Sequence, residues 1–316
     1  MDDKMLCFMI FLSSNMWHDS ATRPSSTGQK FHTTLPTDKK VWDECVEAAV
    51  KNGFNSILVD VGDGIIYKSH PEIAVEGAWT PEFMNTEVKR LKSMGLKVYP
   101  KLNFSACHDA WLGEYGRMLS TSIYYQVVKD LIKEVCEIFE GPELFHLGLD
   151  EENAEQQEEF DYVVYRQFDL IWHDLNFYFD CVGENGARPW IWADWSWSHF
   201  DDFVKNVPKD VLISPWYYRN MFLDFGMPES CTYWKTILDS YPKLDNAGYE
   251  IVSTGSNWAI DYNIDHNFRF CEEKISPEHF KGILIAPWAH TTEKGRERLL
   301  KAIELTGEAY EKYWNK

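Results

Sequence analysis

Short apolar segments alternate with longer segments of helical periodicity along the whole 316-residue chain. Short runs of apolar or β-branched residues between turn residues are typical of buried strands, and apolar residues spaced three and four apart predict helices. The predicted strands are Met5–Leu12, Ser56–Val61, Lys97–Asn103, Leu144–Leu149, Pro189–Ala193, Val211–Ser214, Glu250–Thr254 and Gly282–Ala286. The predicted helices between and after them include Thr37–Asn52, Thr80–Met94, Thr121–Phe139, Gln156–Phe179, Cys231–Asp239 and Glu293–Tyr313.

Strands that are separated by helices pair in parallel through right-handed crossovers. Eight such units fit a closed (β/α)8 barrel, the TIM barrel of the α/β class, better than the alternative of an open doubly wound sheet. The sequence has no Gly-, Ser- or Pro-rich linker that would divide it. We therefore expect residues 1–316 to form one barrel domain.

The charge balance restricts the partners of this chain. It has 31 basic and 50 acidic residues, a formal net charge of −19, which repels phosphate backbones and anionic lipid. We therefore expect no nucleic-acid partner. No apolar run is long enough to span a bilayer, and Met1-Asp2-Asp3-Lys4 lacks the basic start of a signal peptide. These features predict a soluble protein and leave its compartment undetermined.

The residues typical of metal and cofactor sites are present without the corresponding spacing. Seven dispersed cysteines predict mostly free, buried thiols. Metal ligands could come from His18, His108, His146, His290 and Asp63, but no H-x-H or H-E-x-x-H spacing occurs, so we expect no metal. Without a G-x-S-x-G or G-x-G-x-x-G sequence, acyl transfer and dinucleotide binding have no support, and we expect no cofactor.

Aromatic and acidic residues follow nearly every predicted strand. Aromatic residues make up 16% of the chain and 14 of them are Trp, whose flat apolar rings stack on the C–H faces of sugars. In a barrel the active site lies where strands end. The residues at these positions are Trp17, His18, Asp63, His108, Trp111, Asp150, Glu151, Glu152, Trp192, Asp194, Trp195, Trp216, Tyr217, Tyr218, Asn257, Trp258, Trp288 and His290. The pattern predicts a small carbohydrate or glycoside as the substrate.

The Asp150-Glu151 pair after the fourth strand is the sharpest local signal. Adjacent residues that leave a strand point to opposite sides, so one can face the barrel axis while the other reaches over the rim. A solvated acidic loop explains the pair equally well, because Glu152, Glu155 and Glu158 follow closely.

Residues 146–151, His-Leu-Gly-Leu-Asp-Glu, resemble the His-x-Gly-Gly-Asp-Glu signature of family 20 glycoside hydrolases, the β-N-acetylhexosaminidases. The similarity extends over about residues 54–153. It includes the second strand up to Asp63-Gly64, the loop 69–80, and Val98-Tyr99-Pro100 followed by His108.

The resemblance implies a retaining hydrolase of terminal N-acetylhexosamines in which the 2-acetamido oxygen of the substrate is the nucleophile. Glu151 would be the general acid and base, and Asp150 would hold the acetamido nitrogen. Asp63 and His108 would form a supporting polar pair. The remaining predicted contacts to the sugar are Trp192, Asp194, Trp216, Tyr217, Trp258 and Trp288.

The chain departs from the family pattern at several places, including Trp288-Ala289-His290 where the family has Trp-x-Glu. Leu149 stands where the motif has a second glycine, Lys101 where the third-strand motif has an acid, and no arginine in residues 11–17 matches the one that holds sugar hydroxyls in the family. Two alternatives therefore remain. One is a sugar-binding barrel without turnover, and the other is a glycosidase that uses Glu151 with Asp194 as base or nucleophile.

Overall fold

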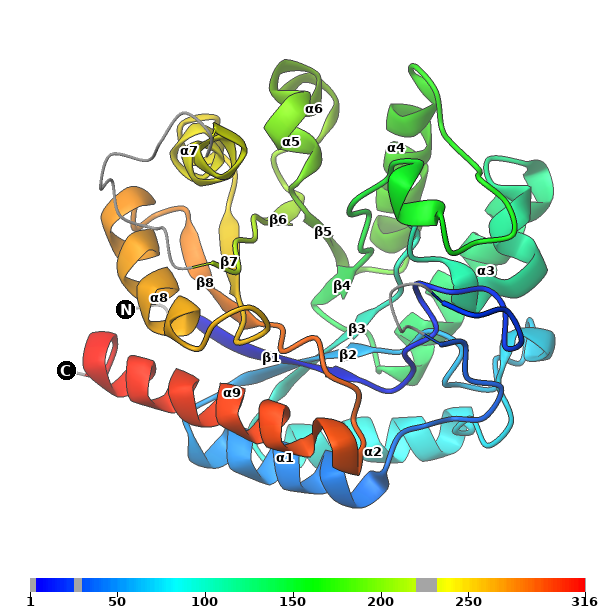
Figure 1. The fold of residues 1–316 in the computed structure, drawn as a ribbon, viewed down its shortest axis with the longest axis horizontal. Coiled ribbons are helices and arrows are strands. Elements are labelled where there is room, and N and C mark those ends of the chain that lie inside the picture. Colours follow the sequence, from blue (N-terminus) through cyan, green and yellow to red (C-terminus); the bar gives the residue numbers. More distant parts are fainter. Residues whose placement is uncertain (1–3, 26–29, 220–231, 316) are drawn as a thin grey trace.

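The computed structural model describes residues 4–25, 30–219 and 232–315. Its strands close into a parallel barrel in chain order, with the first and last strands paired (Figure 1). The strands are β1 (Met5–Phe11), β2 (Ser56–Asp60), β3 (Lys97–Lys101), β4 (Leu144–His146), β5 (Arg188–Trp192), β6 (Leu212–Ser214), β7 (Ile251–Gly255) and β8 (Phe280–Ile285). The predicted (β/α)8 barrel is thus confirmed and the open sheet is excluded.

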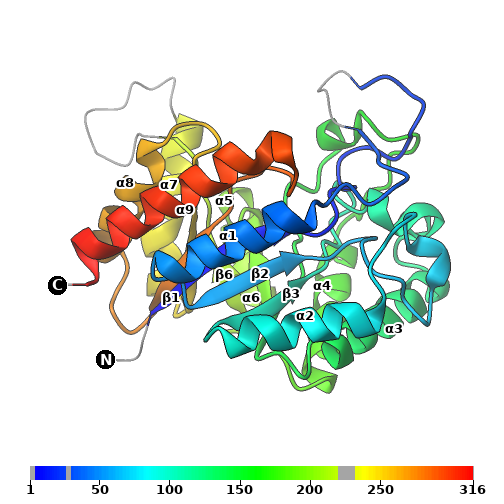
Figure 2. The same ribbon diagram turned by 90° about the horizontal axis from the view of Figure 1, so that it is seen from below.

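Helices surround this barrel, and α9, α1 and α2 lie side by side next to β1 and β2 (Figure 2). The α-helices are α1 (Lys39–Lys51), α2 (Pro81–Ser93), α3 (Ser122–Ile138), α4 (Leu170–Glu184), α5 (Trp195–Ser198), α6 (Phe200–Asn206), α7 (Thr232–Asn246), α8 (Tyr262–Lys274) and α9 (Glu293–Tyr313). Short 3₁₀ segments are η1 (Pro71–Ile73), η2 (Ala110–Met118) and η3 (Glu155–Gln157). No helix of the described residues has the length and apolar character needed to cross a membrane.

The first half of the predicted helix Gln156–Phe179 is wrong. The side chain of Gln157 donates to the backbone oxygen of Val164 (2.9 Å) and accepts from its backbone N–H (2.8 Å), which closes a loop in place of helical turns. Phe168 then has φ +53°, and the helix starts only at Leu170. The predicted start of another helix, Cys231, lies outside the described residues.

Two apolar layers hold the barrel. Alternate strand residues such as Phe8 and Ile10 point outward and pack against the helices, whereas Met9 and Phe11 point into the barrel. This alternation follows from the two-residue period of a strand. The six described cysteines (Cys7, Cys45, Cys107, Cys136, Cys181 and Cys271) are buried and free, as predicted for these positions, while Cys231 is outside the described residues.

The same alternation buries one ion pair inside the barrel. Asp60 at the end of β2 and Lys101 at the end of β3 both face inward, and the Lys101 ammonium donates to the Asp60 carboxylate. Both side chains are almost fully removed from solvent. Because an isolated charge is very unfavourable at such depth, each group depends on the other.

Candidate active site

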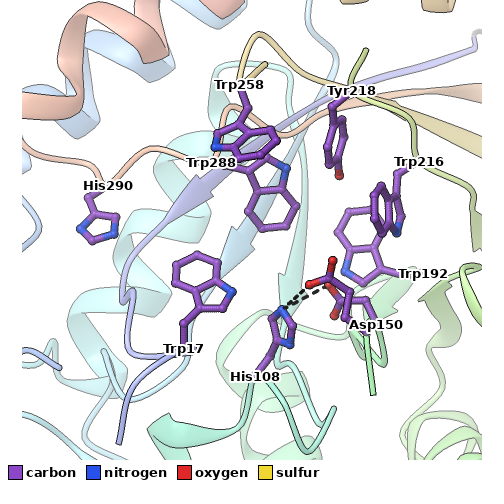
Figure 3. Close-up of a pocket in the computed structure, with 10 residues that line it drawn as sticks. Trp17, His108, Asp150, Trp192, Trp216, Tyr218, Trp258, Trp288 and His290 are labelled. Carbon is purple, nitrogen blue, oxygen red and sulfur yellow. Dashed lines mark ion pairs between the residues drawn. The ribbon is translucent and has the colours of Figure 1, made fainter. Parts of the chain in front are cut away.

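A pocket of about 240 Å³ lies at the carboxyl ends of the strands (Figure 3). This volume is below the roughly 300–1,000 Å³ of typical small-molecule sites, so the pocket suits a single sugar ring better than an oligosaccharide. Its lining comes from the end of β5 and from the loops after six other strands: Trp17, His108, Asp150, Glu151, Trp192, Trp216, Tyr218, Trp258, Trp288 and His290.

Aromatic rings form most of the pocket wall. Trp288 is central, with its ring centroid 6.2 Å from each of Trp17, Trp192 and Tyr218. Trp216 stacks on Tyr218 at 5.1 Å. The indole N–H of Trp192 is buried and has no hydrogen-bond partner among the described residues, so it is available to a ligand. The wall therefore offers apolar ring faces and a hydrogen-bond donor, as a sugar requires.

The loop after β4 carries the two carboxylates in a strained conformation. Gly148, Leu149 and Glu151 have φ of +71°, +70° and +53°. A Cβ on Gly148 would come within 2.0 Å of the side-chain oxygen of Asn103, which explains the glycine. Left-handed backbone costs a non-glycine residue about 1–2 kcal/mol, and such strain is concentrated at functional sites. Leu149 keeps the conformation that a glycine adopts readily, while its side chain packs in the outer core.

Asn103 holds this loop and orients Asp150. Its amide nitrogen donates to the Asp150 carboxylate (2.8 Å), and its amide oxygen accepts from the backbone N–H of Leu149 (3.1 Å) and of Ser105 (3.1 Å). Below the loop, the thiol of Cys107 donates to the backbone oxygen of Glu151 (2.9 Å). The position of the carboxylate pair is therefore fixed by neighbouring side chains on the β3 loop.

His108 joins the two carboxylates. Its Nε2 lies 3.6 Å from Asp150 and 3.4 Å from Glu151. Burial alone would lower the pKa of His108, but the Asp150 charge, with hydrogen bonds to Cys107 and Glu151, raises it well above its usual value. Asp150 is buried, whereas the Glu151 side chain is 32% exposed. Glu151 is thus the member of the pair that faces solvent.

The same three residues are the only described group with three possible metal-ligand atoms within 4.8 Å of one another. A histidine must be neutral to bind a metal ion. Because the pKa of His108 is raised by its carboxylate neighbours, the imidazole is held in its charged form. A metal ion would have to displace the proton of His108 to bind here.

Asp194 supports the loop and does not line the pocket. Its carboxylate accepts the backbone N–H of Glu151 (2.8 Å). Burial, with the nearby charge of Asp150, raises the pKa of Asp194 to about 8, so the group is largely protonated at neutral pH. A buried carboxyl outside the pocket lining, with one oxygen held by the Glu151 backbone, is poorly placed to act as nucleophile or base.

Two other predicted site residues lie elsewhere. Asp63 is buried and accepts from the Ser13 hydroxyl and from Asn15 (2.8 Å), and no described contact pairs it with His108. Burial raises the pKa of Asp63 to about 7. Tyr217 packs in the outer core, and its neighbour Tyr218 lines the pocket.

The remaining predicted residues come together. Asp150, Glu151, His108, Trp192, Trp216, Trp258 and Trp288 all line the pocket. Trp17, Tyr218 and His290 also line the pocket; they are among the strand-end residues of the sequence analysis but not among its predicted sugar contacts. Asn103 was missed because an amide at a strand end has no distinctive pattern.

Comparison with known proteins gives a fold relationship. No model of a known protein family matches the sequence, and no curated protein matches it. The structure is similar to a family 20 exo-β-N-acetylglucosaminidase from Vibrio harveyi in complex with N-acetylglucosamine (TM-score 0.61, 14% identity, covering 96% of this chain and 54% of that one). It is also similar to a Flavobacterium johnsoniae chitobiase (0.60, 16%, 86% and 46%) and to Dispersin B (0.59, 14%, 99% and 100%).

The chain spans about half the length of the Vibrio and Flavobacterium proteins. Its barrel nevertheless corresponds to the whole of Dispersin B. The resemblance to family 20 that the motif predicts is therefore confirmed in the fold, at low sequence identity.

Proposed function

We propose that this barrel is a glycoside hydrolase that removes a terminal N-acetylhexosamine with retention of configuration. One observation carries the proposal. Asp150 and Glu151 are the only carboxylates among the described residues that line the pocket, and both contact the same nitrogen of His108. They therefore lie on one side of the site, and neither can attack the anomeric carbon from the face opposite the other.

The separation of the two carboxylates agrees with this. One oxygen of each lies within 4.8 Å of the other, below the roughly 6.5–9.5 Å of an inverting glycosidase and near the roughly 5–5.5 Å of a retaining one. A conventional retaining enzyme needs its nucleophile on the opposite face of the sugar, where the pocket offers indole rings. The nucleophile is then supplied by the substrate, through its 2-acetamido oxygen.

Glu151 protonates the leaving oxygen while the acetamido oxygen bonds to the anomeric carbon, which gives an oxazolinium ion. Asp150 accepts the acetamido N–H and stabilises the positive charge that develops on the nitrogen. Glu151 then takes a proton from water, which opens the oxazolinium ring at the anomeric carbon. The charged His108 contacts both carboxyl groups and balances the charge of Asp150.

The geometry favours this proposal over the alternative in which Asp194 is the nucleophile or base. That carboxyl is buried outside the pocket lining, is bound to the Glu151 backbone, and has a pKa that burial raises. Glycosides without a 2-acetamido group should accordingly be poor substrates.

Asp150→Asn tests the proposal most directly. The charge on Asp150 matters more in the transition state than in the ground state, so kcat should fall more than KM rises. A thiazoline mimic of the oxazolinium ion should bind the native protein far more tightly than the parent sugar does. A sugar-binding protein without turnover would bind both within a small factor. Turnover of an unsubstituted glucoside without inhibition by the thiazoline would overturn the proposal.

Replacement of Glu151 by Gln tests the acid. General acid catalysis contributes roughly 10²–10⁴-fold, so kcat should fall by that order for alkyl glycosides and less for activated aryl glycosides, which need little protonation. Equal kcat values of the variant and the native protein on both substrates would remove Glu151 from this role.

A further inference from the structure

The pocket carries its charged groups on one side only. His108 contacts both Asp150 and Glu151 there. The lining that the structure describes has no Lys or Arg and no further carboxylate. Figure 3 shows His290 on the side away from Asp150. A ligand that spans the pocket thus meets charged groups at one end and neutral groups at the other.

The buried hydrogen-bond donors of the pocket wall lie toward the charged side. The indole N–H of Trp192 and the hydroxyl of Tyr218 are buried without a partner among the described residues. Burial, with the charges of Asp150 and Glu151, raises the pKa of Tyr218 well above its usual value, so this hydroxyl lies within reach of the carboxylate charges. The indole N–H of Trp288 is turned toward the same hydroxyl (Figure 3). These donors are placed to bind the acetamido group that Asp150 holds.

The side away from Asp150 consists mainly of indole rings. The ring centroid of Trp17 lies 6.1 Å from that of His108 and 6.2 Å from that of Trp288. Figure 3 shows the nitrogen of Trp17 turned toward His108 and its benzene ring turned away from it. Trp258, which is 53% exposed, stands at the pocket mouth. Substituents of a sugar that point to this side therefore meet apolar ring faces.

His290 is the hydrogen-bonding side chain of this side. Burial, with the charges of His32 and Lys294, lowers the pKa of His290, so its imidazole is neutral at neutral pH. A neutral imidazole has one donor and one acceptor nitrogen. The two nitrogens point in widely different directions, so only one of them can face a sugar that is bound on Trp288. His290 can thus satisfy one hydroxyl group of the ligand.

The proposed reaction fixes how the sugar ring lies in this pocket. Glu151 acts at C1, and Asp150 binds the nitrogen on C2. In a pyranose ring the C4–C5 bond lies opposite the C1–C2 bond, so the groups on C4 and C5 point away from the two carboxylates. An ordinary N-acetylhexosamine carries two hydroxyls there, one on C4 and one on C6. The pocket meets them with His290 and otherwise with indole rings.

We infer that the preferred terminal sugar is a 6-deoxy-N-acetylhexosamine, whose C6 methyl group packs on the indoles while its C4 hydroxyl pairs with His290. The C6 hydroxyl of an ordinary hexosamine ends one bond further from the ring than the C4 hydroxyl, so it reaches deeper among the indoles. Burial favours a methyl group there, whereas a hydroxyl would lose water without gaining a partner. The inference rests on the proposed function, which sets the orientation of the ring, and adds the class of sugar.

The test compares N-acetylglucosamine with its 6-deoxy analogue in two assays. Titration calorimetry measures the dissociation constants of the free sugars, and hydrolysis of the two aryl β-glycosides gives kcat/KM. An apolar pocket rejects an added hydroxyl by up to about 100-fold, so the 6-deoxy sugar should bind and react about 5- to 50-fold better. Because the result is a ratio between two sugars, a general loss of activity in a variant cancels.

Two variants should reduce this preference. His290→Glu supplies a charged acceptor whose two oxygens can pair with both hydroxyls, so the ratio should fall at least about 5-fold. Trp17→Ala admits water, which can pair with the C6 hydroxyl, and should lower the ratio by a second route. Thermal melts check that each variant is folded.

Lys294→Gln is the matched control for His290→Glu. Each substitution makes the charge beside the pocket more negative by one unit, but Lys294 does not line the pocket. The ratio in this variant should equal that of the native protein.

Equal binding and equal kcat/KM of the two sugars would overturn the inference, as would a preference that His290→Glu and Trp17→Ala both leave unchanged. Hydrolysis of both glycosides without preference would refute the 6-deoxy class and leave the proposed function intact. Tighter binding of the 6-deoxy sugar that depends on His290, without hydrolysis of either glycoside, would support the class of sugar and refute the proposed function.

Discussion

Asn103 links the strained loop after β4 to its neighbour, and its replacement should affect both stability and catalysis. In Asn103→Ala, Asp150 loses a buried donor at 2.8 Å, and two backbone N–H groups, of Leu149 and Ser105, lose their acceptor. A hydrogen bond to a charged group contributes about 1.5–3 kcal/mol and a buried unsatisfied donor costs about 1–3 kcal/mol. Because the groups share one side chain and water can enter, we expect a total destabilisation of roughly 3–6 kcal/mol.

Asn103→Asp separates orientation of Asp150 from support of the loop. One carboxylate oxygen can still accept from Leu149 and Ser105, but the other now faces Asp150 with a like charge. We expect the loop to stay folded and kcat on aryl N-acetylglucosaminides to fall about 10- to 100-fold, equivalent to roughly 1.4–2.7 kcal/mol. The loss should shrink at lower pH, where one of the two acids is protonated.

Urea unfolding and steady-state kinetics at several pH values measure both effects. The reasoning predicts large loss of stability for the alanine variant and large loss of kcat for the aspartate variant. If the aspartate variant keeps native kcat at neutral pH, Asp150 is not oriented by this hydrogen bond, and the described role of Asn103 is wrong.

Three further predictions concern other parts of the chain. Lys101→Met leaves Asp60 buried without its partner and should destabilise the protein by about 3–5 kcal/mol in urea unfolding. Adding Asp60→Asn to this variant should recover much of the lost stability. No recovery would contradict the pairing. Gly148→Ala should prevent folding or abolish activity, because its Cβ would clash with Asn103. The control is Gly141→Ala, where nothing lies within 4 Å of the added Cβ. This variant should retain activity and be destabilised by only roughly 1 kcal/mol, the cost of an alanine with positive φ. Burial raises the pKa of Asp109 from 3.8 to about 8, so the native state binds a proton that the unfolded state releases, and this contribution to stability is lost as pH rises from about 4 to 8. In Asp109→Asn the melting temperature should therefore decline less between pH 5 and pH 8 than it does in the native protein. An unchanged decline would contradict the assignment.

The sequence predicts the barrel well because strands and helices are long, periodic and regularly alternating. The sequence of residues 158–169 has helical periodicity but forms a loop, because the Gln157 side chain binds the backbone of Val164 in place of helical hydrogen bonds. That contact depends on tertiary folding and has no signature in the sequence.

The sequence predicts which residues form the site better than it predicts the directions in which their side chains point. The inward and outward alternation of β6 continues beyond its end at Ser214, so Trp216 and Tyr218 line the pocket, whereas Tyr217, like Ile213, packs in the outer core. Asp63 lies three residues after the end of β2, where the direction of a side chain is no longer set by the strand. Asp150 and Glu151 lie even further from the end of β4, and their position depends on the hydrogen bonds of Asn103 and Asp194 to this loop.

The buried thiol of Cys107 gives this chain an internal reporter. The thiol bonds to the backbone of Glu151, and burial raises its pKa, so thiol reagents should not modify it while the loop is closed. With Cys231 replaced by serine and the five other described cysteines buried in strands or helices, the rate of labelling at Cys107 measures how often the loop opens. A ligand that occupies the pocket should slow this labelling in proportion to its occupancy, so binding can be followed in crude mixtures without a chromogenic substrate.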